Sequence, residues 1–215
     1  MEPKDYLTLG LSLLGLFVSV AALYLGQFRR PRFVVTLGPD VHLYYPADGG
    51  SAVYLPMIFS NNSPTRGVIY QIYLRILTPK AQNYYLRWRQ EATIDDQTLE
   101  YSYLGRVKPL TVDGYSSQAK VYWFIWPSSE QPLLFEEGRY SFTAYVWSKH
   151  SAQPDIEVTE NLQLDKQGAL ALADNLKKKD PHTRYAYFVD RGLIATRAQE
   201  DDPNKIWANE ATKPR

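Results

Sequence analysis

Few residues of this chain have types and spacings that could support catalysis. The three histidines, His42, His150 and His182, lie in separate regions, so a metal site or a general base built from them would need the fold to bring them together. The acidic pairs Asp95-Asp96, Glu136-Glu137 and Asp201-Asp202 fall in predicted turns or in the tail, where charges are normally solvated. The sequence has no cysteine, no glycine-rich phosphate-binding or dinucleotide-binding motif, no His-Glu-x-x-His and no Gly-x-Ser-x-Gly. We therefore expect no enzymatic activity, no metal and no cofactor.

A cluster of tyrosine and arginine residues is the strongest candidate binding site. Gln71, Tyr73 and Arg75 alternate along one predicted strand, and the same alternation recurs on the next strand. Because alternate residues of a strand share a face, a hairpin through residues 78–84 would bring the two sets together. Such a patch suits a protein partner or a small anionic or aromatic ligand, and a solvated face with arginine stacked on tyrosine has the same pattern. The candidate patch comprises Tyr73, Arg75, Tyr85, Arg87 and Arg89.

The composition limits the classes of partner. Lys plus Arg number 24 and Asp plus Glu number 23, which gives a net charge of +1. A charge this small provides no bulk field toward nucleic acid, so we expect no nucleic-acid binding. The 215 residues leave room for one domain with appendages.

The elements that must position these residues are mostly strands. Hydrophobic residues alternate with period 2 after residue 33, and turn residues such as Asp48-Gly49-Gly50 and Asp113-Gly114 separate short runs. This pattern predicts a mainly β domain, an antiparallel sandwich or barrel. The nine predicted strands are residues 33–37, 41–45, 52–59, 68–77, 84–90, 99–104, 117–126, 139–148 and 155–164.

One short segment adds a family resemblance. Glu136-Glu137-Gly138-Arg139-Tyr140-Ser141-Phe142 resembles the Asp-x-Gly-x-Tyr-x-Cys segment of immunoglobulin-like domains. Tyr140 matches the corner tyrosine of that family, and Phe142 stands in the place of the cysteine that joins the two sheets. The resemblance covers about ten residues and the number of strands, and the predicted strand 68–77 contains no counterpart of the buried tryptophan on the family's third strand. It implies a cysteine-free, antiparallel immunoglobulin-like sandwich and no particular activity.

The N-terminal segment has the length and composition of a membrane anchor. Between Tyr6 and Phe28 there is no charged side chain, and eight leucines lie from Leu7 to Leu25. The run is roughly 34 Å long as a helix, against a hydrocarbon core of about 30 Å. A cleavable signal peptide is the alternative, with Ser19-Val20-Ala21 as the cleavage site, but the leading segment is not basic and the apolar run continues to Leu25. We therefore expect a single transmembrane helix.

The charges that flank this helix predict its orientation. Arg29, Arg30 and Arg32 follow the helix, whereas Lys4 and the amino terminus precede it. Lys and Arg close to a membrane span tend to stay in the cytoplasm, so we expect a single-pass membrane protein with a cytoplasmic C-terminal domain. The three arginines would also contact anionic lipid.

Small residues inside the predicted helix form a seam. They recur at spacings of 4, 3, 4, 3 and 4 residues, which places them on one face and lets two helices approach closely. The 3.5-residue period indicates left-handed crossing, with this chain itself or with the helix of another subunit. Chance is the alternative, since small residues are common in membrane helices. The seam comprises Thr8, Ser12, Gly15, Ser19, Ala22 and Gly26.

Residues 120–126 are apolar on both faces of a strand, so both faces need cover. If Val121, Trp123 and Ile125 point into the core, the opposite face, with Tyr122, Phe124 and Trp126, needs the C-terminal segment, a partner or the lipid headgroups. A short amphipathic helix follows the candidate N-cap Asp165 and stops at Asp180-Pro181. Two short runs, 185–189 and 193–196, then predict a small hairpin, and the chain ends in a polar tail.

These patterns divide the chain into an anchor with a basic flank (1–30), a β-sandwich (31–164), a helix and hairpin packed on the sandwich (165–198) and a polar tail (199–215).

The first functional hypothesis is a membrane-anchored, non-enzymatic module for protein interaction or assembly. The second is a ligand-sensing membrane effector, in which a small anion binds the β-domain and controls association of the membrane helix. The third, which requires the opposite orientation, is an outer-side sandwich that binds carbohydrate or envelope proteins.

Overall fold

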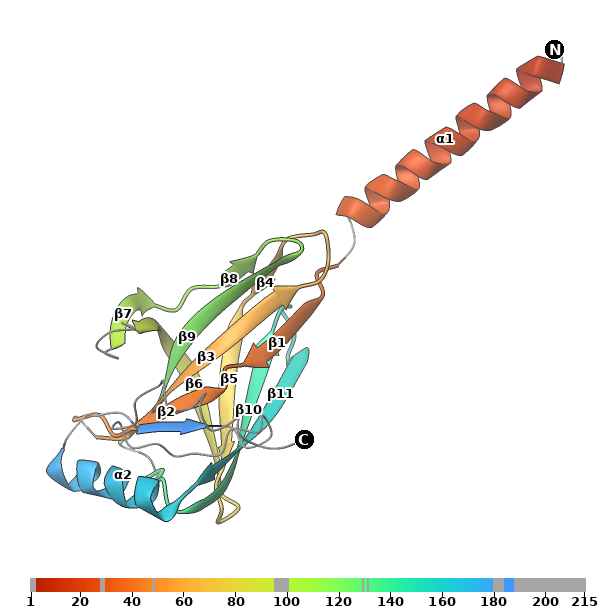
Figure 1. The fold of residues 1–215 in the computed structure, drawn as a ribbon. Helices are drawn as coiled ribbons and strands as arrows, with labels where there is room; N and C mark the ends of the chain where they lie inside the picture. The colour runs from red at the N-terminus through yellow and green to blue at the C-terminus, as the bar shows by residue number, and fades with distance from the viewer. Residues whose placement is uncertain are drawn as a thin grey trace, which may run out of the picture.

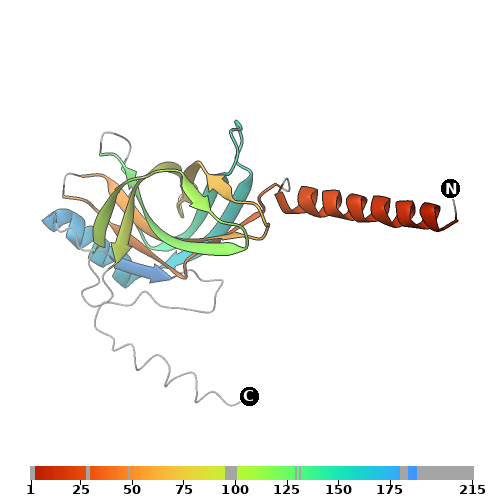
Figure 2. The same cartoon turned by 90° about the horizontal axis from the view of Figure 1, so that it is seen from above.

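The protein is described by a computed structural model that covers residues 3–27, 30–47, 49–94, 101–128, 130, 132–179 and 184–187. The first element, α1 (Pro3–Gln27), is a straight helix that stands away from the β-rich body (Figures 1 and 2). None of its apolar stretch, residues 3–26, is buried against the rest of the chain. The helix is long and apolar enough to cross a membrane.

Twelve strands and a second helix follow in the described residues. The first strands are β1 (Phe33–Leu37), β2 (Asp40–Tyr44), β3 (Ser51–Asn61), β4 (Gly67–Ile69), β5 (Gln71–Leu77) and β6 (Asn83–Ile94). The later strands are β7 (Tyr101–Arg106), β8 (Leu110–Val112), β9 (Ser116–Trp126), β10 (Gly138–Trp147), β11 (Ile156–Leu164) and β12 (Arg184–Tyr187). The helix α2 (Lys166–Lys178) lies between β11 and β12.

Ten of these strands form one antiparallel sheet in the order β11-β10-β5-β6-β9-β3-β2-β12, with β1 beside β3 and β7 beside β6. The sheet curls until β1 contacts β11, which gives a nearly closed barrel (Figure 2). Four of its strands have ten or more residues, and the natural twist of such long strands accumulates across a sheet until its edges approach. The mainly β, antiparallel prediction is therefore confirmed. The two-sheet immunoglobulin-like sandwich is not confirmed, because one continuous sheet surrounds the core.

The predicted strand 68–77 is two strands in the structure. Gly67–Ile69 pairs with Leu110–Val112 in a separate two-stranded sheet, and Gln71–Leu77 joins the barrel. Tyr70 lies between them, and its backbone N–H donates to the carbonyl of Trp147. The short strand β8 was not predicted, because three residues are too few for an alternating pattern to stand out.

The strand that is apolar on both faces, β9, turns the opposite face to the core from the one considered in the sequence analysis. Tyr122 and Phe124 are fully buried inside the barrel, and Trp126 packs against the same core. Val121, Trp123 and Ile125 lie on the outer side, against a second cluster that contains Tyr44, Ala52, Tyr54 and Ala92. The neighbouring strand β3 is apolar on both faces as well, so the outer face of β9 is covered from within the chain. The C-terminal helix does not provide that cover.

The helix α2 instead packs on the barrel at the end of the body opposite α1 (Figures 1 and 2). The side chain of Asp165 caps it by accepting a hydrogen bond from the Gly168 N–H at 2.7 Å. Leu172 is fully buried in the barrel core, and Ala169 packs against that core. The expected helix is therefore present. The segment after it contributes β12, which pairs with β2, and the second half of the predicted hairpin (193–196) and the tail (199–215) lie outside the described residues.

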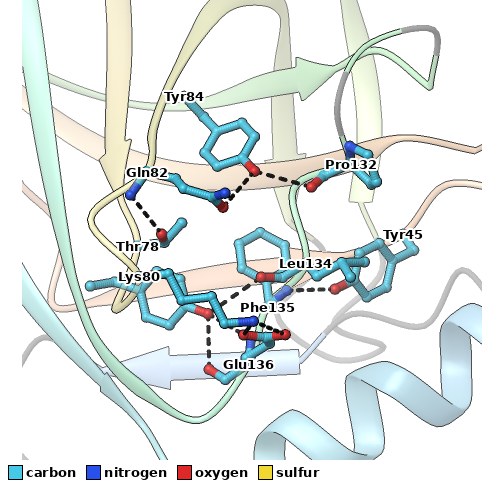
Figure 3. Close-up of polar contacts among 10 residues, drawn as sticks. Tyr45, Thr78, Lys80, Gln82, Tyr84, Pro132, Leu134, Phe135 and Glu136 are labelled. Carbon is cyan, nitrogen blue, oxygen red and sulfur yellow. Dashed lines mark hydrogen bonds and ion pairs between the residues drawn. The ribbon is translucent and has the colours of Figure 1, made fainter.

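The loop before β10 inserts Leu133 and Phe135 into the core and is held by tyrosine hydroxyls (Figure 3). Tyr45 accepts a hydrogen bond from the Phe135 N–H at 2.7 Å, and Tyr84 donates to the carbonyl of Pro132 at 3.1 Å. The Tyr140 hydroxyl accepts from the Glu136 N–H at 2.6 Å and donates to the Glu136 carbonyl at 2.9 Å. This is the backbone bond that a corner tyrosine makes, although it is a local feature and leaves the immunoglobulin-like architecture unconfirmed.

Candidate functional site

The hairpin of β5 and β6 brings four residues of the predicted patch together on the outer face of the barrel. Tyr73 is opposite Arg87, and Arg75 is opposite Tyr85. The third strand, β10, extends both rows, because Tyr145 is opposite Tyr73 and Thr143 is opposite Arg75. We call this surface the Tyr/Arg face and define it as Tyr73, Arg75, Tyr85, Arg87, Thr143, Tyr145 and Trp147. The sequence analysis missed the three residues from β10, because their alternation places them on one face of a strand but only the pairing of β10 with β5 places that face beside Tyr73 and Arg75.

Arg75 is held in place at the centre of this face. Its guanidinium carbon lies 5.7 Å from the centre of the Tyr145 ring, a cation–π distance. One terminal nitrogen donates to the Thr143 hydroxyl at 3.2 Å, and that hydroxyl lies 3.0 Å from the hydroxyl of Thr159. The buried Nε of Arg75 has no hydrogen-bond partner among the described residues. The arginine is therefore fixed by neighbours that leave its positive charge unneutralised.

Aromatic rings make up most of the rest of the face. Tyr73 meets Trp147 edge-on, with ring centres 5.7 Å apart. Tyr85 is 54% exposed, so its ring stands free on the surface. Stiff aromatic side chains beside arginines are the composition of protein-interaction hot spots.

Arg89, the fifth residue of the predicted patch, belongs to an adjoining hollow. Trp88 is opposite Phe124 and Gln90 is opposite Trp123, so Arg89 is the extra residue of a β-bulge. The hollow has a volume of about 620 Å³ and is lined by three arginines, Arg87, Arg89 and Arg106. Gln90, Trp88, Val107 and Trp123 complete its lining. We call it the arginine hollow.

The strand β7 supplies Arg106, which the sequence analysis missed. Gln90 is opposite Arg106, Glu91 is opposite Gly105 and Ala92 is opposite Tyr103, so Leu104 is an extra residue on β7. This second irregularity lies next to the bulge at Arg89. The sequence does not show how β6 and β7 align in register. An alternating pattern therefore could not have linked Arg106 to Arg87 and Arg89.

Within the described part of the chain, no carboxylate forms an ion pair with Arg75, Arg87, Arg89 or Arg106. The nearby carboxylate of Glu91 is paired with Lys120. Guanidinium groups stay charged at every pH at which the protein is folded. Among the described residues, the arginines of the Tyr/Arg face and of the arginine hollow thus have no ion-paired carboxylate, and Glu157 lies opposite Tyr145 at the edge of the face.

A tyrosine–tryptophan cluster supports the far wall of the hollow. The indole N–H of Trp123 donates to the Tyr44 hydroxyl at 2.7 Å, and the hydroxyls of Tyr54 and Tyr103 are 2.7 Å apart. The rings of Tyr44 and Tyr54 stack with 5.3 Å between their centres. Burial and these neighbouring hydroxyls raise the pKa of Tyr44 far above its usual value, so Tyr44 stays neutral. It fixes Trp123 and anchors β7 through Tyr103.

The seam residues lie on one face of α1, within about 80° of arc at 100° per residue. The three hydroxyl groups already donate within the helix: Thr8 to the Lys4 carbonyl, Ser12 to the Thr8 carbonyl and Ser19 to the Gly15 carbonyl, at 2.8–2.9 Å. No seam residue contacts a second helix in this single chain, so helix pairing stays a prediction.

Arg30 and Arg32 are exposed after α1, where contact with lipid headgroups is open to them. The carbonyl of Arg32 accepts a hydrogen bond from the Asn62 N–H at 2.8 Å, which ties this segment to the barrel. Arg29 lies outside the described residues.

The histidines do not converge in the described residues. His42 is fully buried and its Nε2 lies 2.7 Å from Asp40, and burial lowers the pKa of His42 although Asp40 opposes this shift. His150 stacks on Tyr70, with 4.0 Å between the ring centres, and His182 lies outside the described residues. The searched residues contain no group of three side chains suited to a metal ion.

No family model and no curated protein matches this chain. A solved structure of a family 123 glycoside hydrolase from Clostridium perfringens, concerned with glycolipid glycan hydrolysis, aligns with a TM-score of 0.31 and 9% sequence identity. The alignment covers 60% of this chain and 26% of that chain, so this chain spans about a quarter of the enzyme's length. A likeness at this level carries no argument about fold or activity.

Proposed function

We propose that this protein is a single-pass, membrane-anchored and non-enzymatic interaction module that binds an acidic segment of another protein on its Tyr/Arg face. The observation that carries the proposal is the pair of cross-strand rows in which Tyr73, Arg75 and Arg87 lie together without an acidic partner in the described residues. Such a face supplies positive charge, stiff aromatic surface and hydrogen-bond donors at the same place.

A protein segment fits this face better than a small molecule does. The rows cross β6, β5 and β10 and present a broad surface that is exposed at Tyr85 and fixed at Arg75. Broad surfaces of this kind bury too little of a small molecule for tight binding. They suit a partner that covers the aromatic rings and places carboxylates on the arginines.

The anchor sets where the module acts. In this proposal α1 spans the membrane, Arg29, Arg30 and Arg32 keep the barrel in the cytoplasm, and the seam of α1 pairs with another copy or with a partner helix. We also propose that the barrel derives from a cysteine-free immunoglobulin-like arrangement, supported by the backbone bond of Tyr140. Binding on the Tyr/Arg face requires neither the pairing of α1 nor the immunoglobulin-like arrangement.

Charge reversal on the face tests the proposal. The full-length chain, purified from its own membranes in mild detergent, should co-purify with an acidic protein that dissociates as salt rises. Arg75→Glu combined with Arg87→Glu should abolish this capture, because two attractive contacts become repulsive. Arg139→Glu is the matched control, since Arg139 is an exposed arginine of β10 outside the face. Equal capture by the double variant and by the wild type would overturn the proposal.

A second candidate function is a ligand-sensing membrane effector, in which a small anion binds the barrel and controls pairing of α1. The arginine hollow is the observation that favours it, because three arginines are among the residues that line a space of small-molecule size. A membrane two-hybrid signal from α1 that changes when a bound anion is removed would support this alternative.

A further inference from the structure

We propose that the arginine hollow is a binding site for a small, soluble molecule that carries a diphosphate group. The inference rests on the second candidate function and names its ligand class. It uses Arg87, which the Tyr/Arg face shares, together with Arg89 and Arg106, which that face does not contain.

The charge of the hollow selects a multiply charged anion. Its three guanidinium groups carry three positive charges, and no described carboxylate pairs with them. Like charges held together repel one another, so an arrangement of this kind gains stability when an anion lies between them. A single carboxylate offsets one charge, whereas a diphosphate offsets two or three and offers oxygens to every guanidinium.

The backbone positions these arginines for convergence. Arg87 and Arg106 come from regular positions of β6 and β7, and Arg89 is the extra residue of the bulge that β6 forms opposite β9. A bulge redirects a side chain that regular alternation would send elsewhere, and it opens the ladder beside it. The Val107 N–H bonds to the Arg89 carbonyl at 3.3 Å, which fixes β7 against the bulge.

The walls of the hollow are already rigid before a ligand binds. Trp88 is buried and packs against Tyr122, and the indole N–H of Trp123 is bonded to Tyr44. A preformed wall spares the ligand the cost of ordering the site. The two tryptophans also lie close enough to the arginines to report an anion through their fluorescence.

Inorganic pyrophosphate is the probe that tests this inference. We expect it to change the tryptophan fluorescence of the full-length chain in detergent with saturation, and to raise the melting temperature. Orthophosphate and sulfate at the same ionic strength should bind at least roughly 10-fold more weakly, because each reaches fewer guanidinium groups. No saturable change with pyrophosphate, or equal binding of sulfate, would overturn the proposal.

Variants locate the site and separate the two proposals. Arg106→Gln and Arg89→Gln should each weaken pyrophosphate binding by roughly 10-fold or more, and Arg139→Gln should leave it unchanged. Circular dichroism confirms that each exposed-site variant is folded. Arg75→Gln should impair capture of the acidic protein and keep pyrophosphate binding. Arg106→Gln should instead impair pyrophosphate binding and keep capture of the acidic protein. If the double variant Arg106→Gln with Arg89→Gln still binds pyrophosphate, the inference about the arginine hollow is overturned. The proposal for the Tyr/Arg face would not be affected by that result.

Discussion

The buried tyrosines make the stability of the barrel depend on alkaline pH. Tyr44, Tyr45, Tyr122 and Tyr140 are each at most 6% exposed. Burial raises the pKa of Tyr45 from 10 to about 12 and raises the pKa of the other three further. In the unfolded chain a tyrosine ionises near pH 10. The folded state therefore keeps protons that the unfolded state releases above that pH.

The sign of the effect follows from this difference. The stabilisation by the neutral tyrosines is fully present below pH 10 and is lost as pH rises toward 12 for Tyr45, and beyond it for the others. Each tyrosine lowers the free energy of unfolding by about 1.4 kcal/mol per pH unit in this range. The four together lower it by about 5 kcal/mol per pH unit, against a usual total of about 5–15 kcal/mol. We expect the barrel to unfold cooperatively between about pH 11 and 13.

Urea titrations of the full-length chain in detergent micelles, followed by tryptophan fluorescence between pH 8 and 11.5, measure this slope. Absorbance at the tyrosinate band reports ionisation in the same samples. Tyr45→Phe should reduce the slope by about one quarter, because one of four titrating groups is removed. Tyr115→Phe, at a residue that is 74% exposed, should leave it unchanged. A stability that is flat from pH 9 to 11.5 while the tyrosines ionise would refute this reasoning.

Three further predictions concern single structural features. Tyr140→Phe leaves the Glu136 N–H without its partner and should cost about 1–3 kcal/mol of unfolding free energy in the same urea titration, whereas a change below about 0.5 kcal/mol would show that the hydroxyl does not have this role. Leu172→Ala removes a fully buried side chain of α2 from the barrel core and should cost about 2–5 kcal/mol; if thermal stability is unchanged, α2 does not pack on the barrel in solution. Gly15→Ile with Ser19→Ile should abolish helix association in a membrane two-hybrid assay. Because no described residue outside the backbone of the helix lies within 4 Å of a Cβ at Gly15, an unchanged signal would show that the seam does not cause association.

The individual strands were easier to predict from the sequence than the curling of the sheet into a barrel. Alternation over residues 139–148 and 155–164 identified β10 and β11, because each buries one face and leaves the other toward solvent. The choice between sandwich and barrel depends on strand twist and on the contact of β1 with β11, and neither leaves a pattern in the sequence. The face of β9 was ambiguous because both of its faces are apolar.

The candidate site was predictable where a local hairpin builds it and not elsewhere. Tyr73, Arg75, Tyr85 and Arg87 come together because one short turn joins β5 to β6. Thr143 and Tyr145 join them only through the pairing of β10 with β5, which is distant in sequence. Arg106 reaches Arg89 through two irregular positions on β6 and β7, and such positions break the alternation on which the sequence analysis relied.

Site-specific crosslinking tests the central claim most directly, since it asks whether the Tyr/Arg face of the anchored protein touches an acidic partner. A photoreactive phenylalanine in place of Tyr85, in the full-length chain in its own membranes, should give a covalent adduct whose partner peptide is rich in Asp and Glu. The same group in place of Tyr115, an exposed residue outside the face, should give none, and Arg75→Glu with Arg87→Glu should abolish the adduct at position 85. Adducts that are absent at position 85, or that persist after charge reversal, would contradict the account.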